Sequence, residues 1–447
     1  MVTKDQILVT NLPMKNQLLF KLFTPKFFKE FQSLKFEENF KNYTKDKLTH
    51  FMKVISKEVP YYRSLNIKGS DIFHFPFLTK EIIRGNFNNL KNQFYPASRF
   101  ILDSTSGSTG EPIKFYHDLN LYNRRMAYAE FGDSFSGWEL GEPRLIIWGA
   151  ERDIKKKMSR RFAHSKFFFN TKILSSYYLT NDDLIEIIKT INSFKPVLIS
   201  GYPSTLDFIS NYIRSKGGLV HKPRVIVIGG ETLYDSQKTL IQEVFQCKVL
   251  RRYGSREFGV IASECQEQQG LHIHSDRIFL EILNEKLEQT QAGELGEIII
   301  TDLENYVFPF VRYRIGDIGI LSDDNCKCGR KSPLLKSIEG RTFDLIVGTN
   351  GNRVPGNFFT LLRNKIKGLI KFQVVQKKYG SIHFNAVVNE LFNLEEKNKL
   401  ILELKSKLGN DTMIEINVCN DIDLTDSGKF RFVISEVNPF KNVLKTK

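Results

Sequence analysis

The sequence is poor in the features that mark secreted, membrane-spanning and disulfide-rich proteins. Its 447 residues contain only five cysteines, too few for a disulfide framework in a chain of this length. No apolar run approaches the ~18 residues that a membrane-spanning helix needs. The first residues lack the basic and then apolar layout of a signal peptide. We therefore expect a cytoplasmic protein without a membrane span.

Acidic residues are fewer than basic ones, because 50 Asp and Glu stand against 65 Lys and Arg, which gives a net charge of +15. Such an excess fits nucleic acid, an anionic membrane surface or acidic substrates as partners. The lysines are spread along the chain, and the densest basic run, at 155–161, is short. We therefore favour a solvated lysine-rich surface and expect no nucleic-acid partner.

The chain has enough apolar residues for a large core and enough length for two or three domains. Alternating patterns predict helices over 121–133, 182–194 and 204–215 and strands over 144–148, 197–200 and 224–228. This alternation predicts a parallel sheet with helices on both faces, and ligands bind such sheets outside the carboxyl ends of the strands. Beyond residue 277, paired strands over 278–283 and 297–301 indicate a β-rich subdomain.

We place a domain boundary near Gly340, which gives an N-terminal domain over 1–340 and a C-terminal domain over 341–447. Within the second, we expect helices over 356–367 and 394–408 and strands over 371–376, 381–388 and 413–418. That order is typical of a small α+β domain with one antiparallel sheet. The predicted fold class is therefore α/β, with a large N-terminal domain of mixed or parallel sheets covered by helices and a small α+β C-terminal domain.

The stretch over 103–110 holds five hydroxyl residues and two glycines between apolar neighbours. Exposed N–H groups in such a turn form a concave anion site, to which hydroxyls add further donors. The stretch is not a Walker loop, because no Gly-Lys-Ser/Thr closes it. The composition fits a polyphosphate-binding loop, and a polar linker has the same composition.

Six motifs in a fixed order resemble the adenylate-forming superfamily of acyl-CoA synthetases. Within it, they are most similar to the phenylacetate–coenzyme A ligase family, in its capsular-polysaccharide-biosynthesis branch. The motifs are residues 105–112, 229–231, 253–257, 312–317, Gly340-Arg341 with Asp344, and 427–429. The resemblance implies ATP-dependent activation of a carboxylic acid to an acyl-adenylate, with release of pyrophosphate. It also implies acyl transfer to a thiol, usually coenzyme A, and a mobile C-terminal domain.

The resemblance also implies a role for each motif residue. The nucleotide-binding set is Ser106, Gly107, Ser108, Thr109, Gly110, Gly230, Glu231, Tyr253, Gly254, Ser255, Asp317 and Arg341. In this set, the 106–110 loop would cradle phosphates, Tyr253 would flank the adenine, and Asp317 would accept the ribose hydroxyls. Glu257 would help hold Mg²⁺, and Lys429 would bridge the substrate carboxylate and the α-phosphate. Glu257 and Lys429 are the expected catalytic pair.

The hinge between the two domains departs from the family pattern Gly-Arg-x-Asp-Asp. Phe343 occupies the first Asp position and leaves Asp344 alone. In the family, the hinge absorbs the rotation of the C-terminal domain between the two half-reactions. Because the hinge sequence differs here, the acceptor in the second half-reaction stays open between coenzyme A and another group. A second interpretation is a catalytically reduced nucleotide-binding scaffold of polysaccharide assembly. The presence of Lys429, Glu257 and Asp317 favours the ligase.

Two cysteine-containing stretches suggest a structural metal. Cys326 and Cys328 form a close pair, and Cys265 lies shortly before His272 and His274. Two pairs of N and S ligands suit tetrahedral Zn²⁺. We prefer His272 because its surroundings resemble those in the family, and only one of two alternating histidines can face the thiols. The alternative is a set of unrelated cysteines.

Overall fold

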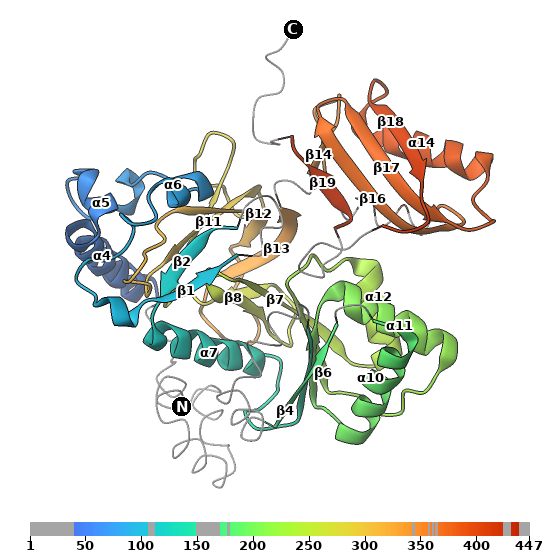
Figure 1. The fold of residues 1–447 in the computed structure, drawn as a ribbon, viewed down its shortest axis with the longest axis horizontal. Coiled ribbons are helices and arrows are strands. Elements are labelled where there is room, and N and C mark those ends of the chain that lie inside the picture. Colours follow the sequence, from blue (N-terminus) through green and yellow to red (C-terminus); the bar gives the residue numbers. More distant parts are fainter. Residues whose placement is uncertain are drawn as a thin grey trace.

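The computed structural model describes residues 40–437 apart from 106–111, 149–169, 177–178, 342–344, 356–357, 360–361, 363–364 and 423–430, and describes residues 40–43, Arg341, Arg353 and Pro355 by their backbone alone. An eleven-stranded sheet in the order β10-β11-β12-β13-β9-β8-β7-β6-β5-β3-β4 forms its centre. Figure 1 shows α10, α11 and α12 beside one end of this sheet, α4 to α6 near the other end, and a separate C-terminal sheet. The predicted fold class is confirmed.

The parallel half of the sheet follows the predicted alternation of strands and helices. Its strands are β3 (Arg144–Trp148), β4 (Thr171–Ser175), β5 (Leu198–Gly201), β6 (Val225–Gly229) and β7 (Lys248–Ser255). Its helices are α7 (Leu119–Ser134), α10 (Asn181–Phe194), α11 (Pro203–Lys216) and α12 (Asp235–Phe245). Thr180 begins α10 with a capping box to Asp183, and Lys195, at φ 50°, ends it.

Both faces of this half are covered, as predicted. Leu198, Val227 and Leu250 pack with α7 on one face, whereas Ile199 and Ile226 pack with α10 to α12 on the other. Successive strand residues thus bury opposite faces, which explains why these strands read as continuous apolar runs.

The predicted β-rich subdomain continues the same sheet. Its strands are β8 (Gly259–Glu264), β9 (Leu271–Ile273), β10 (Ile278–Leu283), β11 (Leu295–Asp302), β12 (Tyr313–Ser322) and β13 (Leu334–Arg341). The antiparallel β7–β8 hairpin joins the two halves. Strand β13 returns to pair with β9 at two positions, Leu334 with His272 and Leu335 with Leu271.

A layer of N-terminal elements packs against the antiparallel half. It consists of α4 (Phe40–Glu58), α5 (Pro60–Ser64), η1 (Ile72–His74), α6 (Lys80–Gly85), η2 (Ala97–Arg99), β1 (Ile101–Ser104) and β2 (Lys114–His117). Phe51, Ile83 and Phe115 from this layer share one buried cluster with Ile298 and Phe310. The layer places the β1–β2 hairpin, which carries the predicted phosphate loop, beside the sheet.

The C-terminal sheet differs from the antiparallel sheet that the sequence predicts. Its four strands, in the order β18-β17-β16-β19, are β16 (Leu369–Lys378), β17 (Ser381–Val388), β18 (Met413–Val418) and β19 (Val433–Ser435). Helix α14 (Leu394–Leu408) lies between β17 and β18 in the chain, and β14 (Leu345–Val347) and β15 (Arg353–Pro355) form a separate two-stranded sheet. Strands β16 and β17 are antiparallel, but β17–β18 and β16–β19 are parallel. The expectation of a wholly antiparallel sheet was wrong, because α14 acts as a crossover that returns the chain to the same end of the sheet. The expected helix over 356–367 lies partly outside the described residues.

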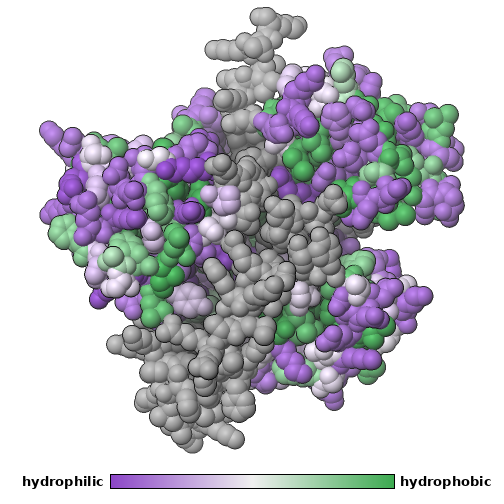
Figure 2. Space-filling model, viewed as in Figure 1, coloured by the Kyte–Doolittle hydropathy of each residue, from purple (hydrophilic) through white to green (hydrophobic). Residues whose placement is uncertain are grey.

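The surface mixes polar and apolar side chains without a single dominant patch on the visible face of the described residues (Figure 2). Within the described part of the chain, no helix combines the length and the apolar character that a bilayer crossing requires.

Candidate active site

Two aromatic side chains pack together at the carboxyl ends of the parallel strands. They are Trp148, the last residue of β3, and Tyr202, which follows β5. Their ring centroids lie 4.1 Å apart. Gly230, at φ +83°, follows β6, and a Cβ atom there would lie 2.8 Å from the Tyr202 ring. Only glycine therefore fits at this position. The adjacent Glu231 accepts a hydrogen bond from the Ser204 N–H at 3.1 Å, in the first turn of α11.

Tyr253 and Asp317, predicted to share the nucleotide pocket, are in direct contact. The Tyr253 hydroxyl donates to Asp317 Oδ2 at 2.6 Å, and both side chains are buried. Tyr253 lies near the end of β7, in which Gly254 and Ser255 are the last residues, and Asp317 lies in β12. Asp317 also pairs in register with Arg341 of β13. The structure thus brings residues of three separate motifs to one place.

Glu257 lies in the tight turn between β7 and β8, where Ser255 pairs with Gly259. Its side chain is buried, and Oε1 accepts a hydrogen bond from the Tyr313 hydroxyl at 3.3 Å. The Ser255 hydroxyl accepts from the Phe258 N–H at 3.3 Å. The turn is therefore held by side chains on two sides.

The predicted phosphate loop connects β1 and β2. Ser106, Gly107, Ser108, Thr109 and Gly110 themselves lie outside the described residues, but the hairpin closes around them, because the Thr105 N–H donates to the Ile113 carbonyl at 3.0 Å. Arg256 Nη1 lies 4.0 Å from Asp103 Oδ1 of β1. This contact places the hairpin next to the Glu257 turn.

Lys429 and the hinge residues Phe343 and Asp344 also lie outside the described residues. Among the described residues that follow Lys429 in the chain, Phe432 has its ring 5.5 Å from that of Tyr234. Tyr234 follows Glu231 closely in the chain, so Phe432 lies near the 229–231 motif.

The predicted metal ligands come together from three loops and strands. Cys265, His272, Cys326 and Cys328 offer ligand atoms that all lie within 4.8 Å of one another. Cys265 Sγ lies 3.5 Å from Cys326 Sγ, and His272 Nε2 lies 3.3 Å from Cys328 Sγ. His274 is outside the group and contacts Ser263. Zinc at this cluster stays a prediction.

The surroundings of the cluster suit a cation. The Ser332 hydroxyl lies 2.9 Å from His272 Nδ1 and orients the ring so that Nε2 faces the thiols. Burial lowers the pKa of His272 to about 4, so its ring is neutral near pH 7. Burial raises the pKa of Cys265 to about 12. A bound cation would stabilise its thiolate form.

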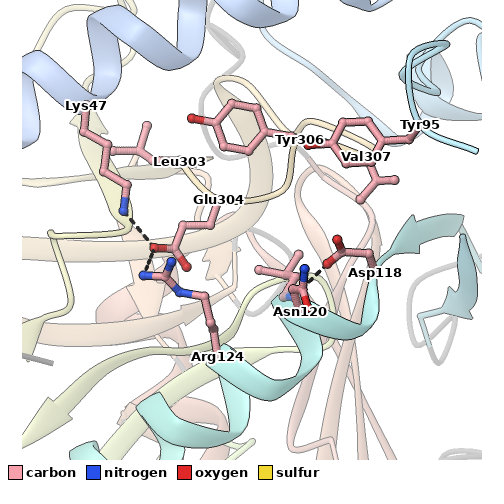
Figure 3. A pocket seen from close by; sticks show the side chains of 10 residues that line it. Lys47, Tyr95, Asp118, Asn120, Arg124, Leu303, Glu304, Tyr306 and Val307 are labelled. Carbon is pink, nitrogen blue, oxygen red and sulfur yellow. Dashed lines mark hydrogen bonds and ion pairs between the residues drawn. The ribbon is translucent and has the colours of Figure 1, made fainter. Parts of the chain in front are cut away.

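A cavity of about 320 Å³ lies at the N-terminus of α7, and none of the predicted site residues lines it (Figure 3). In this cavity Lys47 and Arg124 each meet Glu304 at 2.7 Å. No local sequence pattern pointed to the contacts of Lys47 and Arg124 with Glu304. Tyr313 lies inside the 312–317 motif, but no role was predicted for it.

Solved structures that share this fold include a CoA ligase. The 2-hydroxyisobutyryl-CoA ligase in its postadenylation state with 2-HIB-AMP matches at a TM-score of 0.70, 17% identity and 90% coverage of each chain. ATP-bound MatB from Rhodopseudomonas palustris matches at a TM-score of 0.54 and 14% identity, over 74% of this chain and 66% of that one. The fold is therefore that of adenylate-forming enzymes.

Sequence relatives narrow the class. Protein CapK of Staphylococcus aureus is 27% identical over 91% of this chain and 89% of its own length. The phenylacetate-coenzyme A ligase of Pseudomonas putida is 26% identical over 79% of this chain and 82% of its own length. The family model for the CapK C-terminal domain matches residues 346–436. The chain is therefore similar over most of its length to CapK and to the phenylacetate–coenzyme A ligases, and these relatives support an enzyme of the acid–thiol ligase type.

Proposed function

We propose that this chain activates a carboxylic acid with ATP and Mg²⁺, releases pyrophosphate, and passes the acyl group from the adenylate to coenzyme A. The observation that carries the proposal is the buried Tyr253–Asp317 hydrogen bond at 2.6 Å. It presents a carboxylate beside an aromatic ring at the edge of the sheet where ligands of α/β proteins bind. Resemblance to the capsular-polysaccharide branch supports a role in surface polysaccharide assembly.

The residues support adenylate formation by positioning and by electrostatics. A carboxylate oxygen of the acid attacks the α-phosphorus of ATP, and the bond to the bridging oxygen of pyrophosphate breaks. Lys429 would neutralise the charge shared by the acid and the α-phosphate, and Asp317 would fix the ribose. The 106–110 loop would hold the leaving phosphates through backbone N–H groups and hydroxyls.

Glu257 fits the role of a magnesium ligand. Its carboxylate is buried in a braced turn, and Tyr313 occupies only one of its acceptor positions. Mg²⁺ prefers carboxylate and phosphate oxygens and would neutralise charge on the phosphates. Glu257 would therefore orient the ion toward ATP from the side of the sheet.

We further propose that Cys265, His272, Cys326 and Cys328 hold a structural Zn²⁺. Three sulfurs and one ring nitrogen are a common closed zinc ligand set. The ligands join the end of β8, strand β9 and the loop between β12 and β13. The ion would fasten these elements and take no part in the chemistry.

We also propose that the C-terminal domain over 341–447 rotates between the half-reactions, with Phe343 and Asp344 as its hinge. An apolar Phe343 in place of an aspartate would pack against one orientation and bias the equilibrium between the half-reactions. The proposed domain boundary near Gly340 falls at the last residues of β13.

The decisive experiment is a screen for pyrophosphate release across aryl, acyl, amino and sugar acids, with and without coenzyme A. The proposal predicts acid-dependent release with at least one acid and a thioester when coenzyme A is added. A chain that binds ATP but releases no pyrophosphate with any acid would support the nucleotide-binding scaffold.

Replacing Asp317 with alanine should weaken ATP binding at least about tenfold and reduce discrimination between ATP and 2′-deoxy-ATP. Hydrogen bonds from a diol to a carboxylate contribute roughly 1.5–3 kcal/mol each. Titration calorimetry with the two nucleotides measures both effects. Tyr253→Phe is the matched control, because it removes the hydroxyl that contacts Asp317 and keeps the carboxylate. Unchanged discrimination in Asp317→Ala would mean that another residue contacts the ribose.

A further inference from the structure

The turn that carries Glu257 rests on a fully buried arginine, Arg277. Its Nη1 donates to the Val260 carbonyl at 2.8 Å, and its Nη2 donates to the Phe258 carbonyl. These two carbonyls lie on either side of Gly259, immediately after Glu257. One planar guanidinium thus binds the carbonyls of two alternate residues, Phe258 and Val260. A lysine ammonium group could not reproduce this forked geometry.

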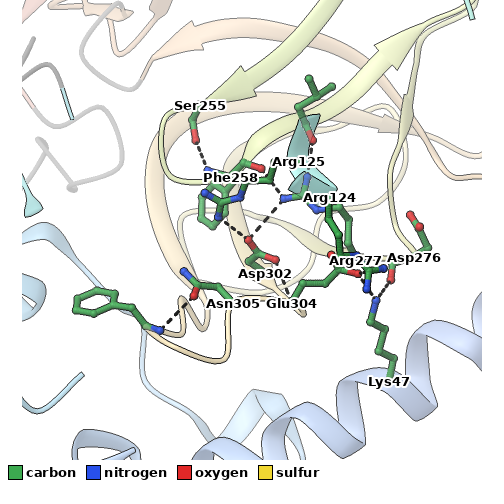
Figure 4. Close-up of polar contacts among 12 residues, drawn as sticks. Lys47, Arg124, Arg125, Ser255, Phe258, Asp276, Arg277, Asp302, Glu304 and Asn305 are labelled. Atoms are coloured by element: carbon green, nitrogen blue, oxygen red, sulfur yellow. Dashed lines mark hydrogen bonds and ion pairs between the residues drawn. The ribbon is translucent and has the colours of Figure 1, made fainter. Parts of the chain in front are cut away.

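Asp302 lies beside Arg277 in the interior and supplies an opposite charge. Asp302 Oδ2 is 3.5 Å from Arg277 Nη2, and it also accepts from Arg125 Nη2 at 2.9 Å. Both Arg277 and Asp302 are fully buried. Burial alone would raise the pKa of the Asp302 carboxyl, but the two guanidinium groups hold it below its ordinary value. Figure 4 shows Asp302 between Arg125 and Arg277, close to Phe258.

Arg125 presses on the same turn from the side of α7. A Cβ atom on Gly259, which has φ +68°, would lie 3.4 Å from the Cβ and Cγ atoms of Arg125. The turn is therefore enclosed by the Arg125 stem and the Arg277 guanidinium, and Asp302 joins the two arginines. We call Arg125, Arg277 and Asp302 the arginine clamp.

We propose that Arg277 is a positioning residue that sets the Glu257 carboxylate for Mg²⁺·ATP, an inference that rests on the proposed function. Mg²⁺ demands nearly ideal octahedral geometry at short distances, about 2.0–2.1 Å, so a small shift of its protein ligand weakens binding. Among the described residues, the polar contacts of Arg277 are with Phe258, Val260 and Asp302, and none is with the Glu257 side chain. Arg277 acts through the backbone that follows Glu257, and a general structural role would not affect metal dependence selectively.

The test measures ATP binding by calorimetry at a series of Mg²⁺ concentrations, together with the melting temperature of each variant. Arg277→Lys keeps the charge but loses the planar fork, and Asp302→Asn removes the partner charge with little change in shape. We expect both variants to raise the Mg²⁺ concentration that half-saturates the enhancement of ATP binding, by about tenfold for Arg277→Lys. The second variant carries the test if the first does not fold.

Arg144→Lys is the matched control, because Arg144 is also a buried arginine and its carboxylate partner, Glu130 at 2.7 Å, lies in α7 and not in the Glu257 turn. We expect this control to lower the melting temperature and leave the Mg²⁺ dependence unchanged. The same Mg²⁺ dependence in wild type, Arg277→Lys and Asp302→Asn would overturn the inference and leave the proposed function intact. No ATP binding by the wild-type chain at any Mg²⁺ concentration would overturn both.

Discussion

Replacing Lys429 with alanine should abolish acid-dependent pyrophosphate release and leave ATP binding nearly unchanged. Lys429 is expected to contact the acid carboxylate and the α-phosphate, where charge gathers during adenylate formation. Removal of a single preorganised electrostatic contact of this kind costs on the order of 10²- to 10³-fold in rate. Because the contact forms in the transition state, the turnover number should fall and nucleotide affinity should not.

Steady-state pyrophosphate release and equilibrium ATP binding together check this prediction. Lys397→Ala is the matched control, because Lys397 is an exposed lysine of the same domain, in helix α14. It should behave as wild type in both measurements. Pyrophosphate release at the wild-type rate by Lys429→Ala would show that the assignment of Lys429 is wrong.

The second large effect should follow the loss of the cysteine–histidine cluster. Protein purified without a histidine tag or added zinc should contain nearly one Zn²⁺ per chain, and Cys326→Ser should lose it. Binding of a structural zinc ion contributes directly to folding free energy, so the melting temperature should fall by several degrees or more.

Elemental analysis and thermal unfolding measure the two outcomes on the same samples. Cys247→Ser is the matched control, because this half-buried thiol packs against the core shared by α10 to α12 and lies outside the metal cluster. It should keep the zinc. Wild-type protein that is free of metal and has full stability and activity would contradict the prediction.

Most of the parallel half was predictable because local sequence decides it. Short sequence patterns predict both a buried strand, such as Val225–Gly229, and a capped amphipathic helix, such as Asn181–Phe194. The direction of a strand in a sheet depends on how the chain returns to it. The sequence therefore predicted the strands of the C-terminal sheet but not the parallel pairing of β17 and β18.

The site divides in the same way. Motif order predicted that Tyr253 and Asp317 belong together, and residue chemistry selected Cys265, His272, Cys326 and Cys328 as one group. The arginine clamp could not be predicted from the sequence, because an isolated Arg or Asp is usually exposed. Its members become partners only after α7, the turn before β10 and the end of β11 have packed together.

The pairing of β9 with β13 also has a consequence for the order in which the chain folds during synthesis. Strands β5 to β8 are complete once residue 264 has been made, but β9 must wait for Leu334 and Leu335, more than sixty residues later. Non-local pairing of this kind is slow, because the chain loses entropy on closing the loop before stabilising contacts form. Until β13 is made, the edge of β9 opposite β8 is unpaired. An exposed strand edge can pair with another molecule, so the chain depends on β13 to cover it.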